Sequence, residues 1–79
     1  MDFNRFPDKK AVESQKDYLK SADLEGGDLS DTNLSGANLV YADLSNSNLS
    51  NANFTGANLN GANLSNVIAV GANFSKCEF

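Results

Sequence analysis

The sequence predicts an all-β solenoid over residues 19–79, preceded by a short capping segment over residues 1–18. Three observations lead to this expectation. A large apolar residue, usually leucine, recurs at every fifth position; a small residue stands two positions before it, and Asp or Asn stands one position before it. Helices gather residues on one face at steps of three and four, and flat strands at steps of two, so a strict period of five fits neither. The chain therefore has to turn a corner once in each repeat.

Every leucine of the protein lies in this register, which is interrupted once, at Ala69. The apolar positions are Leu19, Leu24, Leu29, Leu34, Leu39, Leu44, Leu49, Phe54, Leu59, Leu64, Phe74 and Phe79. The predicted corners are Gly26, Gly36, Gly56, Gly61, Gly71, Asn46, Asn51 and Asn66, residue types that tolerate the positive φ of tight turns. The small residue and the leucine point inward, and the Asp or Asn between them points outward.

This A-[D/N]-L-x-x pattern resembles the pentapeptide-repeat family over about three quarters of the chain. The resemblance implies a right-handed quadrilateral β-helix with about twenty residues per coil, and therefore about three coils stacked at roughly 4.8 Å. Each inward side chain then covers the one twenty positions earlier, and one repeat cannot bury its leucine alone. One inner column is Leu19, Leu39, Leu59 and Phe79, and an outer ladder of shared amide hydrogen bonds is Asn33, Asn53 and Asn73.

Residues 1–18 lie outside the repeat and are expected to cap the solenoid, whose end otherwise exposes core side chains and unpaired backbone. Pro7 suits the first turn of a helix, and Asp8 adds negative charge where the helix dipole favours it. The stretch 8–17 contains no helix breaker and predicts a short helix. The side chains expected to pack on the first coil are Phe3, Phe6, Val12 and Tyr18.

Two kinds of outward residue are candidates for a partner surface. The net charge of −4 resides on the repeats, mostly in the first coil, where it forms either a binding surface or a solvated exterior. These acidic candidates are Asp23, Glu25, Asp28 and Asp31. Apolar residues at outward positions also suggest a contact. These apolar candidates are Val40, Tyr41, Ile68 and Val70; the inward Val67 is expected to fill part of the space left by Ala69.

The sequence stops in register, with Phe74, Cys77 and Phe79 near its end and no polar capping segment after them. An open solenoid end with aromatic residues tends to associate. We therefore expect these three residues to form the interface of a two-fold, end-to-end homodimer. The alternative is that the chain is a piece of a longer solenoid.

Several classes of function are disfavoured. The absence of histidine excludes a His-based triad and the usual zinc sites, and the single cysteine cannot form an internal disulfide. The repeats carry two basic residues against six acidic ones, which argues against nucleic-acid binding. No long apolar run or secretory signal occurs, so no membrane association and a cytoplasmic location are expected. No cofactor site is indicated.

The resemblance therefore implies a non-enzymatic structural or protein-interaction module with an unknown partner. The alternative is an acidic DNA mimic, because some dimeric members of the family bind DNA gyrase or topoisomerase and protect it from inhibitors. This chain departs from those members in its short length and in the confinement of its charge to the first coil. Protection of gyrase supercoiling would discriminate between these two hypotheses.

Overall fold

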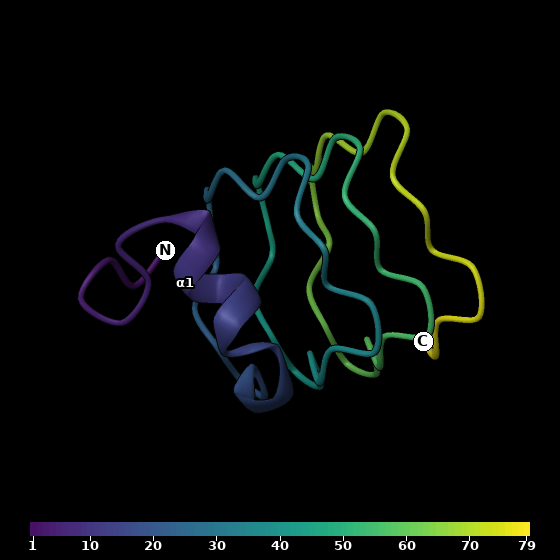
Figure 1. Cartoon of the computed structure of the whole chain (residues 1–79), viewed down its shortest axis with the longest axis horizontal. Coiled ribbons are helices and arrows are strands. Elements are labelled where there is room, and N and C mark those ends of the chain that lie inside the picture. Colours follow the sequence, from purple (N-terminus) through teal and green to yellow (C-terminus); the bar gives the residue numbers. More distant parts are fainter.

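Residues 19–79 wind into a stack of coils whose neighbouring turns run side by side (Figure 1). The computed structural model describes all 79 residues. Eight parallel β-bridges each join residues twenty positions apart, from Asp23–Asp43 to Asn58–Glu78. This is the spacing per coil that the resemblance implies. The molecule measures 30 × 22 × 21 Å, and the N-terminal segment and the C-terminus lie at opposite ends of its long axis (Figure 1).

The bridges are isolated, and no continuous strand forms. Pairing is limited to one residue in each repeat, because the chain turns before successive residues can pair. The small residue's N–H donates back to the preceding apolar residue's carbonyl, as Ala57 does to Phe54 at 2.9 Å. Each repeat thus consists of three residues centred on the bridging residue, followed by a two-residue turn.

The Asp or Asn of each repeat closes a turn within its own repeat. Its side-chain Oδ1 accepts a hydrogen bond from the backbone N–H two positions later, at 3.0 Å for both Asp43–Ser45 and Asn53–Thr55. Such Asx turns favour Asp and Asn for a local reason. Asn33, Asn53 and Asn73 stack in one column through parallel bridges, as predicted, but no hydrogen bond joins their side-chain amides; each Oδ1 accepts from a backbone N–H of its own repeat.

The corners lie where the sequence places them. All eight predicted Gly and Asn corners have positive φ, between 59° and 75°. Four further corners carry other residues, namely Ser21, Asp31, Tyr41 and Lys76, of which only Asp31 belongs to a type enriched at positive φ. The coil enforces positive φ at every fifth residue, so here the tertiary repeat overrides local preference.

The core fills the inside of the coils and is best covered at the N-terminal side of the stack. Inward side chains between Leu19 and Leu59 are buried, whereas those between Ala62 and Cys77 are half-buried. The difference arises because no further coil covers the last one. Val67 and Ala69 are both half-buried and pack against the core.

The N-terminal segment, defined as residues 1–18, contains helix α1 (Lys9–Ser14) and a single 3₁₀ turn, η1 (Lys16–Tyr18). The Asp8 Oδ1 atom accepts from the Ala11 N–H at 3.0 Å, so Asp8 is the N-cap and Pro7 precedes the helix instead of beginning it. The helix is also shorter than predicted. No helix of the chain is long and apolar enough to cross a bilayer.

Only two of the four side chains expected to pack on the first coil do so. Phe6 and Val12 are buried, whereas Phe3 is 65% exposed and Tyr18 is 74% exposed. A helix of six residues presents one short inner face, which Val12 occupies. Phe3 lies in the loop before the helix, and Tyr18 ends the 3₁₀ turn that follows it.

Candidate functional site

The N-terminal segment forms hydrogen bonds with the edge of the first coil that faces away from the second coil. The Asn38 N–H donates to the Lys16 carbonyl at 2.9 Å, and the Asn33 N–H donates to the Glu13 carboxylate at 2.7 Å. In later coils the equivalent N–H groups donate to carbonyls of the coil before. The carbonyls of the first coil that accept from the N-terminal segment are those of Asp23, Glu25 and Ser30. The segment thus replaces part of a missing coil.

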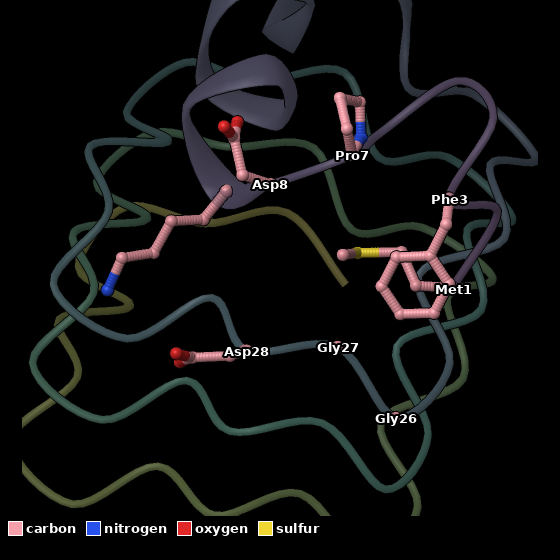
Figure 2. A pocket seen from close by; sticks show the side chains of 8 residues that line it. Met1, Phe3, Pro7, Asp8, Gly26, Gly27 and Asp28 are labelled. Carbon is pink, nitrogen blue, oxygen red and sulfur yellow. The ribbon is translucent and has the colours of Figure 1, made fainter.

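A hollow of about 440 Å³ lies where this replacement is incomplete. It is lined by Met1, Phe3, Pro7, Asp8, Lys9, Gly26, Gly27 and Asp28. Figure 2 shows Met1 and Phe3 of the N-terminal segment on one side of the hollow, and Gly26–Asp28 of the first coil on the other. A Cβ on Gly27 would lie 2.8 Å from the Met1 sulfur, so glycine permits this close approach. No cluster of three side chains suited to a metal ion occurs anywhere in the chain.

The four acidic candidates are exposed on the first coil. Part of their bonding capacity is used within the fold, because the Asp23 carboxylate lies 3.8 Å from the N-terminal ammonium. The Ser30 hydroxyl and N–H donate to Asp28, and these hydrogen bonds lower the pKa of its carboxyl, with a smaller contribution from Lys9. Hydrogen bonds from Ser45 lower the pKa of Asp43 in the same way. Because their pKa values are lowered, the carboxyl groups of Asp28 and Asp43 are ionised at neutral pH.

The apolar candidates lie at two separate places on the outer surface. Tyr41 is 66% exposed at the corner where the first coil ends and the second begins, and the half-buried Val40 precedes it. Ile68 and Val70 are 57% and 76% exposed on the last coil, and Ile68 bridges to Asn48. Both pairs therefore point outward as predicted, but they stack on different columns of the coil.

The C-terminal end brings three predicted residues together. Phe74 stacks on Phe54, and Phe79 tilts against Phe74 with centroids 6.4 Å apart and planes at 49°. The Cys77 thiol donates to the Phe54 carbonyl at 2.9 Å, and partial burial raises its pKa, which disfavours the reactive thiolate. The register predicts an inward Phe79 above Leu59, yet its side chain is 70% exposed, because no neighbouring coil holds it inside.

The backbone of this end is also unpaired. Eleven backbone hydrogen bonds join the second coil (residues 42–61) to the third (residues 62–79). The equivalent groups of the last coil have no partner within the chain. The unpaired donors are the N–H groups of Leu64, Asn66, Ala69, Gly71, Phe74, Lys76 and Phe79, and the unpaired acceptors are the carbonyls of Ala62, Val67, Ala72 and Cys77. We call this set of groups the C-terminal edge.

Comparisons with known proteins agree with this repeat geometry. The sequence model of the family described as pentapeptide repeats matches residues 18–56 and 47–79, with eight copies of the repeat. No curated protein sequence matches. A solved structure, the pentapeptide-repeat protein Rfr23 from the cyanobacterium Cyanothece 51142, is 40% identical in sequence and superposes with a TM-score of 0.73 over 77% of this chain.

A second solved structure is HetL from the cyanobacterium Nostoc sp. strain PCC 7120, a pentapeptide-repeat protein involved in the regulation of heterocyst differentiation. It is 32% identical over 76% of this chain, with a TM-score of 0.29. The match spans 42% of Rfr23 and 33% of HetL. The chain thus corresponds to less than half of either protein.

Proposed function

The chain belongs to the pentapeptide-repeat family, and on that premise we propose that it is a non-enzymatic protein-interaction module that docks a polypeptide at its C-terminal end. Proteins of this family are generally structural repeat proteins and not catalysts. The proposal includes a right-handed, four-sided β-helix of about three coils for residues 19–79, capped by residues 1–18.

The observation that carries the proposal is the combination of an exposed aromatic cluster with the unpaired C-terminal edge. Phe79 is 70% exposed, and the inward side chains next to it, including Leu64 and Phe74, are only half-buried. Apolar side chains beside free N–H and carbonyl groups are the features that let a sheet edge accept another chain. The opposite end of the stack is occupied by the N-terminal segment. The two ends therefore differ in their capacity to bind.

A second copy of the chain is one candidate occupant of this end, as a two-fold homodimer. The test is the solution mass of the parent and of Phe79→Asp, measured by light scattering over a range of concentrations. Phe3→Asp is a matched control, because Phe3 is 65% exposed at the other end of the stack. A dimer that Phe79→Asp dissociates and Phe3→Asp preserves would support docking at this end. Self-association that Phe3→Asp disrupts and Phe79→Asp preserves would contradict it.

The acidic DNA-mimic hypothesis receives less support. A mimic of duplex DNA needs negative charge along its length, but four of the six acidic residues of the repeats lie in the first coil. Part of that coil is also engaged by the N-terminal segment. The direct test is whether the purified chain protects gyrase supercoiling from a quinolone, and we expect no protection.

A further inference from the structure

The C-terminal edge has more hydrogen-bond donors than acceptors. It offers seven unpaired N–H groups and four unpaired carbonyls. The excess follows from the geometry of the repeat. Two N–H groups in each repeat, those of the apolar residue and of the corner residue, are directed to the following coil, together with the carbonyl of the small residue. The end therefore has a defined hydrogen-bonding polarity.

The edge by which each coil meets the coil before it has the opposite polarity. The third coil presents seven carbonyls and four N–H groups to the second coil, and all of them are paired. The accepting carbonyls are those of Asn63, Ser65, Ile68, Val70, Asn73, Ser75 and Glu78. The four donors are the N–H groups of Asn63, Ile68, Asn73 and Glu78. Coil edges are thus complementary only when they stack head to tail.

From this polarity, and on the premise of the proposed docking function, we propose a specific occupant for the C-terminal edge. The occupant is the uncapped first coil of another pentapeptide-repeat segment, which adds in parallel register as a further coil. Its acceptor-rich edge matches the donor-rich edge of this chain, with the eleven-bond pattern that already joins the second and third coils. Main-chain pairing of this kind provides affinity, and inward side chains provide selectivity.

Intact copies of this chain fit the edge less well. Two C-terminal edges that meet about a two-fold axis bring together fourteen N–H groups and eight carbonyls. If each carbonyl accepts one hydrogen bond, as it does between the coils of this chain, six donors lack a backbone acceptor, and a buried unpaired donor is unfavourable. Head-to-tail stacking of intact copies is also obstructed, because the N-terminal segment bonds to the first coil of each copy.

Side chains add a second requirement on the occupant. In the first two coils the inward column below Ala69 contains Leu29 and Leu49. Ala69 is smaller than these leucines and half-buried, so it reaches less far toward a following coil. We expect the docking coil to place a large apolar residue above Ala69. A coil with alanine at that position should bind more weakly, because two small side chains that face each other bury less apolar surface.

The experiment uses the full-length chain and a synthetic peptide with the sequence of residues 42–61. The peptide supplies one complete coil, with the required carbonyls and N–H groups and with Leu49 in register above Ala69. Amide hydrogen exchange of the labelled chain is followed by NMR. At a peptide concentration ten times the dissociation constant, exchange at the seven edge amides should slow about tenfold. The controls are a scrambled peptide and a peptide carrying Leu49→Ala.

The outcomes are separable. Protection of the seven edge amides by the ordered peptide, weakened by Leu49→Ala and absent with the scrambled peptide, supports the proposal. Concentration-dependent protection of the same amides without peptide, together with a doubled mass, identifies a second copy as the occupant. That result overturns this inference and leaves the proposed function intact. Equal protection by the scrambled peptide overturns the parallel register, and absence of protection under all conditions overturns both proposals.

Discussion

Phe74 stacks face to face on Phe54, with ring centroids 5.1 Å apart and ring planes within 6° of parallel. The two residues are twenty positions apart and occupy equivalent places in successive coils. Phe54 is nevertheless fully buried, whereas Phe74 is half-buried. Burial thus depends on whether another coil follows, and not on the residue or its place in the repeat.

Replacement of Phe54 by alanine should destabilise the chain more than replacement of Phe74. Phe54 is enclosed, so Phe54→Ala should lower the free energy of unfolding by about 3–5 kcal/mol. Phe74→Ala removes less buried surface and should cost less. Chemical denaturation of both variants measures the difference. Equal costs would mean that the last coil is covered in solution.

Replacement of Ile68 by asparagine should stabilise the chain. Ile68 is exposed at the one Asp/Asn position among residues 23–73 that lacks either residue, and the Val70 N–H consequently has no Asx-turn acceptor. Ile68→Asn supplies that acceptor and should raise the free energy of unfolding by about 0.5–1.5 kcal/mol. Ile68→Ala is the control, because it removes the apolar surface without adding an acceptor. The idea fails if the asparagine variant is no more stable than the alanine variant.

Two corner glycines should respond differently to alanine. Both have positive φ, +71° at Gly56 and +72° at Gly61, so a side chain at either should cost about 1–2 kcal/mol. A Cβ at Gly56 meets open space, whereas one at Gly61 overlaps the Tyr41 ring. Gly61→Ala should therefore cost about 0.5–1.5 kcal/mol more, the cost of displacing that side chain. Thermal unfolding in a Tyr41→Ala background should remove the difference, and its persistence there would exclude the steric explanation.

The pH dependence of stability should include Asp43. Hydrogen bonds from Ser45 hold the pKa of this carboxyl below its ordinary value of 3.8. The folded-state pKa is the lower one, so the resulting stabilisation is present above the ordinary value and is lost as the pH falls through the depressed value. Ser45→Ala should raise the pKa of Asp43 in an NMR titration. Ser50→Ala beside Asn48 should leave it unchanged, and an equal shift in both variants would contradict the assignment.

Much of the fold can be predicted because the five-residue period is a local pattern that requires one corner in each repeat, and the family resemblance supplies the number of corners in a coil. The corners at Asn46 and Gly61 and the outward positions of Ile68 and Val70 follow from counting. The Asx turns could also have been predicted from the sequence, because an Asp or Asn stands two positions before a Ser in many repeats. The four corners without Gly or Asn show the limit, because no local preference of Tyr41 predicts positive φ.

The candidate site is less accessible from the sequence. The grouping of Phe74, Cys77 and Phe79 at one end follows from the register, but the 70% exposure of Phe79 does not. The extent to which residues 1–18 replace a coil could not be foreseen either. It depends on individual hydrogen bonds, such as the one from the Asn33 N–H to Glu13, which no sequence period specifies.

The sequence by itself determined that the chain turns once in every five residues, because neither a helix nor a flat strand fits that period. The coil of twenty residues was implied by the family resemblance, and the β-bridges between residues twenty positions apart agree with it. Only the tertiary structure decided which backbone groups remain free. Of the backbone groups that bond between coils, each coil directs most N–H groups to the following coil and most carbonyls to the preceding one. Stacking therefore satisfies the interior coils and leaves a donor-rich edge at the C-terminal end. Hydrogen bonds between coils have a direction along the stack, and a pattern of residue types does not encode it.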